Sequence, residues 1–115
     1  MKYAKKEIAP GVVVLEMTGR FVMGTDCQLV NGEIEQCLEK NETKCIFDMT
    51  GVDHIDSAAV GQIVKCFSKL KKSGGMLRLA GVNGMVQRVL NMTQVHRVIP
   101  IYGTAADAAK DFAAK

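Results

Sequence analysis

The sequence has no tryptophan, only two tyrosines, four phenylalanines and two prolines in 115 residues. So few aromatic rings leave little surface on which nucleic-acid bases could stack. The formal net charge is only +3, from 15 basic and 12 acidic side chains that are scattered along the chain. Nucleic-acid binding usually needs a concentrated basic face. These deficits argue against a nucleic acid as the partner.

Long hydrophobic runs are also missing. No segment approaches the roughly 20 apolar residues of a membrane-spanning helix, and the N-terminal segment 1–11 has no apolar stretch of signal-peptide length. We therefore expect a cytoplasmic protein without membrane contact. The four cysteines form no CxxC pair and lie beside apolar neighbours, which favours buried free thiols over a metal site or disulfides; they are Cys27, Cys37, Cys45 and Cys66.

The rest of the composition is that of an ordinary globular protein, with 48% hydrophobic and 23% charged residues. We expect one domain, residues 1–115, around a single core. Strands are expected at residues 2–8, 12–17, 44–49, 76–80 and 98–102, and helices at 25–40, 57–72, 83–92 and from 105 onward.

Local signals refine these elements. Thr25 or Asp26 would cap the first helix, and Asn83 the third. The helix at 57–72 has one apolar face, made of Val60, Ile63, Val64, Phe67 and Leu70. The order β-β-α-β-α-β-α-β-α predicts an α/β fold with a mostly parallel or mixed central sheet of about five strands and about four helices.

The segment 52–62, VDHIDSAAVGQ, lies between the end of a strand and the start of a helix, where functional groups gather in such folds. A serine nucleophile at Ser57 would need His54 or His96 as its base, and no G-x-S-x-G elbow surrounds it. The spacing of Asp53, His54 and Asp56 matches neither HExxH nor a calcium loop, so we expect Asp53 and His54 to be solvated loop residues.

Phosphate-binding motifs are also missing, since the sequence has neither GxxxxGK[ST] nor GxGxxG. A receiver domain phosphorylated on Asp48 would need an acidic pair after the first interior strand, where this chain has Thr18-Gly19-Arg20. We therefore expect no enzymatic activity, no metal and no cofactor.

Two interpretations of Ser57 remain from the residues alone. Asp56 or Ser57 could simply cap the helix. Alternatively, Ser57 could carry a regulatory phosphoryl group, because the N-terminus of a helix attracts anions.

The run 46–104 strongly resembles the STAS domain, which is found in bacterial anti-sigma factor antagonists and on sulfate transporters, and the resemblance covers nearly the whole chain. The resemblance lies in a hydrophobic strand that ends in Asp48, the aliphatic-Asp-Ser step at Ile55-Asp56-Ser57, and Gly61 in the following helix. Gly74-Gly75 before a strand and the Thr18-Gly19 step fit as well. As a free-standing domain, the chain is more similar to an antagonist than to a transporter tail.

The resemblance implies a phosphorylation switch. In this family the serine after the aspartate, here Ser57, is phosphorylated by a serine kinase that doubles as the anti-sigma factor. A metal-dependent phosphatase removes the phosphate, and the unphosphorylated antagonist binds the anti-sigma factor and frees the sigma factor. Two departures stand out: Ala58 removes a neighbouring hydroxyl, and Arg20-Phe21-Val22 stands where many antagonists have an acidic-aliphatic-Asp step.

We predict one partner-binding surface around the helix start and the loop 20–25, comprising Arg20, Met23, Thr25, Asp56, Ser57, Ala58, Gly61, Gln62 and Lys65. An alternative is that Ala58 and Gly61 only complete the solvent face of a helix. A second functional hypothesis is a non-switching STAS scaffold or a subunit of a larger assembly, such as a lipid-transport system. A nucleotide or small-ligand sensor is a third.

Overall fold

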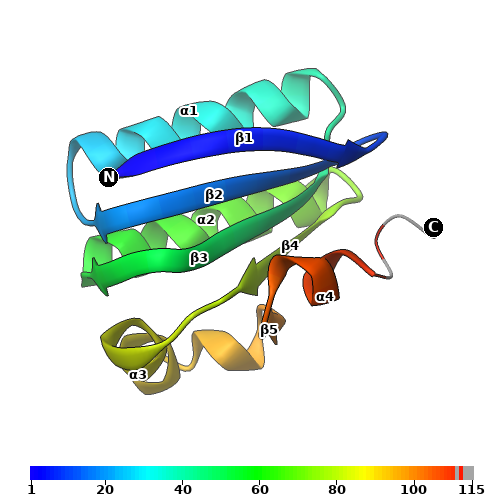
Figure 1. Ribbon diagram of the computed structural model, residues 1–115. Helices are drawn as coiled ribbons and strands as arrows, with labels where there is room; N and C mark the ends of the chain where they lie inside the picture. Colours follow the sequence, from blue (N-terminus) through cyan, green and yellow to red (C-terminus); the bar gives the residue numbers. More distant parts are fainter. Residues whose placement is uncertain (111, 113–115) are drawn as a thin grey trace.

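The computed structural model describes residues 1–110 and 112. The chain forms β1(Lys2–Ala9), β2(Val12–Phe21), α1(Thr25–Glu39), β3(Lys44–Ile55), α2(Ser57–Lys72), β4(Met76–Ala80), α3(Gly84–Met92), a short 3-10 helix η1(Val95–Arg97), β5(Ile101–Tyr102) and α4(Ala105–Ala109) (Figure 1). This order confirms the α/β prediction and adds the short 3-10 helix.

The five strands form one mixed sheet in the order β1-β2-β3-β4-β5. β1 pairs with β2 in an antiparallel hairpin, and every other neighbouring pair is parallel. The hairpin turns at Pro10-Gly11, where Gly11 has a φ of +77° that favours glycine. Parallel pairing places the ends of β2 and β3 side by side, next to the starts of α1 and α2 (Figure 1), whereas β4 ends earlier, beside Asp48 of β3.

Helices cover the two faces of the sheet unequally. α1, α2 and α3 bury their apolar residues against one face, in a core cluster that includes Ile34, Phe47, Ile63 and Leu90. α4 lies on the opposite face and packs with Phe112 against a smaller cluster that includes Val14 and Ile46 (Figure 1). None of the helices in the described residues is long and apolar enough to cross a membrane.

Two strands are several residues longer than the sequence predicts. β2 continues past Met17 to Phe21, and β3 continues past Met49 to Ile55. Val52 and Ile55 are buried, and this burial holds the outer half of β3 in the sheet. The pairing of β2 with β3 shifts register twice in this region. These irregularities break the strict alternation by which a strand is recognised.

Three further predictions were wrong in detail. Gly24, with a φ of +98°, is the N-cap residue of α1 in place of Thr25 or Asp26. The last strand contains only residues 101–102 in place of 98–102. On α2, Val64 is 40% exposed and Cys66 is buried instead. The predicted bounds of α2 and β4 were confirmed to the residue.

Candidate functional site

Asp56 and Ser57 lie at the junction of β3 and α2. Asp56 has an extended backbone and is the N-cap of α2, and its Oδ1 accepts a hydrogen bond from the Ala59 amide at 2.9 Å. This bond satisfies one of the free amides of the first helical turn. Ser57 is the first residue of the helix, and it is exposed. The capping interpretation is thus correct for Asp56, and it leaves the Ser57 hydroxyl on the surface.

The second carboxylate oxygen of Asp56 joins this junction to the loop between β2 and α1. Oδ2 accepts a hydrogen bond from the Met23 amide at 3.0 Å. Hydrogen bonds from Met23 and Ala59 favour the ionised carboxylate and so lower the pKa of Asp56 below its ordinary value. Because both oxygens accept bonds from backbone amides, Asp56 acts as a structural anchor and not as a base directed at Ser57.

The loop 22–24 is held in place by several contacts. Val22 donates its amide to Asp26 Oδ2 at 3.1 Å, and the Gly24 carbonyl accepts from the Gln28 amide at 3.1 Å. Met23 is 73% exposed. An exposed methionine on a fixed backbone can serve as an apolar anchor for another protein.

The parallel pairing of β2 with β3 brings the two parts of the predicted surface together. Arg20 pairs with His54 and Phe21 with Ile55, so the end of β2 lies directly beside the residues that precede Asp56. Arg20 and Thr25 are exposed, whereas Phe21 is fully buried. In the Arg20-Phe21-Val22 step, Arg20 therefore adds a charge to the outer surface, Val22 is half-buried, and Phe21 contributes to the core.

On α2, the predicted residues fall into two groups. Ser57, Gly61 and Lys65 are exposed, and their four-residue spacing places them along one stripe of the helix. Ala58 is half-buried. Gln62 turns towards α1, where its side-chain amide donates to Asn31 Oδ1 at 3.4 Å. Gln62 thus joins the two helices at the margin of the surface.

Asp53 and His54 belong to β3 and not to a loop, which corrects the sequence prediction. His96 lies in the 3-10 helix after α3. Within residues 1–110 and 112, no group of three or more His, Cys, Asp or Glu side chains is arranged to hold a metal ion.

The cysteines are free thiols, as predicted. Cys37, Cys45 and Cys66 are buried, whereas Cys27 is only half-buried. Burial raises the pKa of Cys66 to about 11, and it also raises the pKa of Cys27. These two thiols are therefore protonated near neutral pH and are poor nucleophiles.

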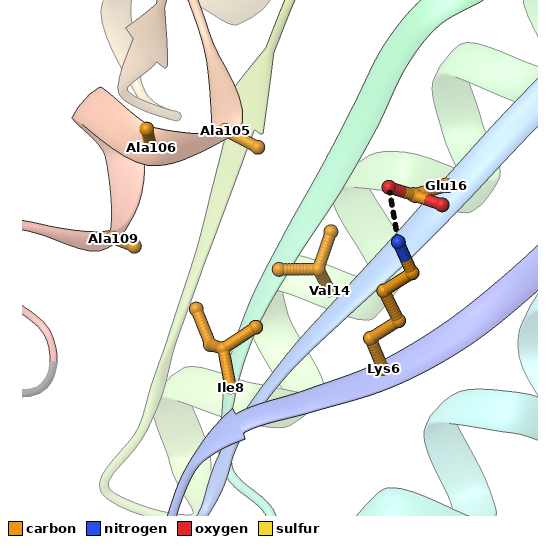
Figure 2. Close-up of a pocket in the computed structure, with 7 residues that line it drawn as sticks. All are labelled: Lys6, Ile8, Val14, Glu16, Ala105, Ala106 and Ala109. Carbon is orange, nitrogen blue, oxygen red and sulfur yellow. Dashed lines mark hydrogen bonds and ion pairs between the residues drawn. The ribbon is translucent and has the colours of Figure 1, made fainter.

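A small cavity lies on the sheet face that α4 partly covers, opposite to the helices that carry the candidate site. It encloses about 220 Å³ and is lined by Lys6, Ile8, Val14, Glu16, Ala105, Ala106 and Ala109 (Figure 2). Its only charged groups, Lys6 and Glu16, pair with each other at 3.2 Å. Ligand pockets usually exceed about 300 Å³ and contain convergent polar groups. This cavity therefore gives no support to the nucleotide-sensor hypothesis.

The sequence model of the STAS domain matches residues 3–108. The chain belongs to the STAS domain family. Over 77 residues, this STAS protein is 32% identical to a Thermotoga maritima protein named "Putative anti-sigma factor antagonist". The aligned segment makes up 67% of this chain and 68% of that protein. The crystal structure of a putative anti-sigma factor antagonist from the same organism matches with a TM-score of 0.85 at 28% identity. The match covers 95% of this chain and 92% of the chain in that structure.

More distant structures share the fold. The anti-sigma factor antagonist SpoIIAA in its unphosphorylated form matches with a TM-score of 0.74 at 17% identity, covering 96% of each chain. The phosphorylated form of the Bacillus cell fate determinant SpoIIAA gives 0.77 at 14% identity, covering 96% of this chain and 99% of its own. The resemblance to the STAS family and the fold class predicted from the sequence are confirmed.

Proposed function

We propose that this STAS protein is an anti-sigma factor antagonist that is switched by phosphorylation of Ser57. The unphosphorylated protein binds an anti-sigma serine kinase in the cytoplasm, and phosphorylation of Ser57 ends that binding. A metal-dependent serine phosphatase then restores the binding form. The observation that carries the proposal is the exposure of Ser57 at the first position of α2, directly after Asp56. The names of the relatives support it.

The position of Ser57 suits a reversible charge. A phosphoryl group adds about −1.5 to −2 charges at neutral pH. At the N-terminus of a helix this charge meets backbone amides and the positive end of the helix dipole. The domain itself would therefore tolerate the modification, which is required of a switch that must be reset.

The added charge would destabilise the complex with the partner. A partner that covers Ser57 would have to desolvate a dianion for which it provides no counter-charge, and such burial is strongly unfavourable. The surface allows close approach, because a Cβ placed on Gly61 would have no atom within 4 Å. Arg20, Met23 and Thr25 extend the contact onto the neighbouring loop, and Lys65 extends it along α2.

The protein would act as a binding module and not as an enzyme. Both oxygens of Asp56 accept bonds from backbone amides, which supports a structural role for this carboxylate. The chemistry of phosphoryl transfer would belong to the kinase. Ala58, the second residue of α2, has no hydroxyl that could compete as a phosphate acceptor, so that Ser57 is the acceptor to test.

The proposal is tested with a candidate for the anti-sigma serine kinase. The candidate is the histidine-kinase-like ATPase whose gene lies nearest to that of this protein. Incubation of the two proteins with ATP, followed by peptide mapping in a mass spectrometer, should find the phosphate on Ser57 and none in Ser57→Ala. Phosphate on another residue, together with normal labelling of Ser57→Ala, would contradict the proposal.

Binding measurements separate the switch from a constitutive scaffold. Ser57→Ala should bind the kinase as the wild type does, whereas Ser57→Asp should bind at least tenfold more weakly. Ser68→Asp is the matched control, because Ser68 is also exposed and lies about 16 Å further along α2. Equal binding by all three variants would instead identify a scaffold or an assembly subunit.

A further inference from the structure

The carboxylate of Asp56 connects two parts of the partner surface that are far apart in the sequence. Oδ1 holds the first turn of α2 through the Ala59 amide, and Oδ2 holds the loop after β2 through the Met23 amide. The two bonds measure 2.9 and 3.0 Å, and the second spans 33 positions of the chain. The position of Met23 therefore depends on a side chain adjacent to Ser57.

The neighbours of Met23 are anchored independently. The Val22 amide is bound by Asp26 Oδ2, and the Val22 carbonyl accepts a hydrogen bond from Cys27 Sγ at 3.5 Å. The Gly24 carbonyl accepts the first backbone bond of α1. These anchors lie within the loop and α1, so a change at Ser57 would not reach them directly. The Met23 amide, in contrast, is bound by the α2 side of the junction.

A phosphoryl group on Ser57 would compete with Asp56 for the same donors. The amides of the first helical turn lack partners within the helix, and Asp56 already binds the amide of Ala59. A dianion is a stronger acceptor of such bonds than a carboxylate. On the residue next to Asp56 it also repels the Asp56 carboxylate. Rotation of the ionised Asp56 side chain away from the turn reduces this repulsion, and that rotation breaks its bond to Met23.

We propose that phosphorylation of Ser57 displaces the Asp56 carboxylate and thereby releases the Met23 amide. The inference rests on the proposed function and deepens it, since it identifies how the modification changes the surface. The phosphate would act twice: it places charge in the interface, and it frees the exposed methionine from the backbone position in which a partner binds it. Asp56 is then a positioning residue that couples the phosphorylation site to the loop.

The test uses the full chain without any partner. Phosphoserine is introduced at position 57 during translation, and solvent exchange of the Met23 and Val22 amides is measured by NMR at neutral pH. Loss of a charge-assisted hydrogen bond should accelerate exchange at Met23 about tenfold. Exchange at Val22, which Asp26 holds, should stay unchanged and serves as the internal control. Phosphoserine at position 68 should leave both amides as they are.

A second variant tests the role of Asp56. Asp56→Asn removes the negative charge and one acceptor oxygen, so that any hydrogen bond it keeps to the Met23 amide is weaker than that of the carboxylate. Met23 should then exchange faster even without phosphate, and phosphoserine at 57 should add little further. Equal protection of Met23 in the phosphorylated and unphosphorylated wild type would overturn the inference. Because no kinase is needed, this result is independent of the labelling and binding experiments that decide the proposed function.

Discussion

Gly75 packs directly against the backbone carbonyl of Thr43, so that a Cβ at position 75 would overlap it. The contact lies where the chain leaves α2 and enters β4, and Met76 donates its amide to the same carbonyl at 3.0 Å. The residues before it form a Schellman motif, in which the Gly75 amide bonds to Leu70 and the Gly74 amide to Lys71. The end of α2 is thus fixed by local turn geometry and by contact with Thr43, the residue before β3.

Gly75→Ala should therefore destabilise the domain. Backbone atoms cannot move aside easily, so we expect a loss of about 2 to 3 kcal/mol in the free energy of unfolding. Gly32→Ala is the matched control, because a Cβ at position 32 has no atom within 4 Å and lies on an exposed part of α1. The free energy of unfolding of Gly32→Ala should exceed that of the wild type by up to about 1 kcal/mol. Urea denaturation measures both, and equal midpoints for the two variants would refute the packing argument.

Asp56 should make stability depend on pH. Its folded pKa is lowered, chiefly by the Met23 and Ala59 amides, whereas the unfolded side chain titrates near its ordinary value of about 3.9. As the pH falls from about 5 through 4 and below, the unfolded state takes up its proton first. The contribution of the carboxylate is therefore complete above this range, and it is lost as the pH falls through the folded pKa.

Asp56→Ala isolates that contribution. At pH 7 the loss of the cap should lower the free energy of unfolding by about 1 to 2 kcal/mol. The difference from the wild type should narrow below pH 4, because the unfolded wild type then binds a proton at Asp56 that the folded protein does not yet bind. Asp53→Ala removes an exposed acid three residues earlier and serves as the control. Denaturation curves between pH 3 and 7 that run parallel for wild type and Asp56→Ala would contradict this account.

Arg78 connects α4 to the sheet. Its guanidinium lies 3.8 Å from the centroid of the Phe112 ring and 5.3 Å from that of Tyr102, and Nη1 donates to the Ala108 carbonyl at 2.7 Å. Arg78→Ala should lower the free energy of unfolding by about 2 kcal/mol. Arg78→Lys should retain only part of the contribution of Arg78, because an ammonium lacks the planar stacking surface of the guanidinium. Kinase binding should not change in either variant, since α4 lies on the other face of the sheet. Weaker binding at unchanged stability would place α4 in the interface.

Arg20 should select a partner with an acidic contact. It is exposed at the end of β2, beside the residues that lead to Ser57. Arg20→Asp should weaken binding of the cognate kinase about tenfold, mainly through the association rate, and the loss should shrink at high salt. Arg88→Asp, at an exposed position on α3, controls for net charge. Biolayer interferometry at several salt concentrations measures these rates, and equal losses for the two variants would exclude a specific role for Arg20.

The sequence predicted an element's bounds accurately where residues close in the sequence determine them, and less accurately where more distant contacts do. The bounds of α2 were predicted to the residue because Asp56 and Gly74-Gly75 are local signals of a helix start and end. The start of α1 was less well predicted, because Gly24 is its N-cap and Asp26 binds the Val22 amide instead of capping the helix. A short polar side chain near a helix start has several possible partners, and the sequence does not distinguish them.

The coupling between Asp56 and Met23 could not be predicted from the sequence. It depends on the pairing of Phe21 with Ile55, and the register of these strands shifts twice before that point. Each shift changes which residues lie side by side, so the apolar alternation alone cannot align the strand ends. The sequence could identify the residues of the candidate surface on both segments, but not the hydrogen bond that joins them.

Gly61 distinguishes a binding surface from an ordinary solvent-exposed helix face. A side chain at this position has open space within the domain, and glycine in a helix costs up to about 1 kcal/mol relative to alanine. Gly61→Ala should therefore raise stability, and Gly61→Gln should fold normally. If a partner packs closely over Gly61, Gly61→Gln should bind the kinase more than tenfold more weakly, because the longer side chain holds the two surfaces apart. Gly32→Gln on α1 should bind normally, and so would Gly61→Gln if position 61 merely faced solvent.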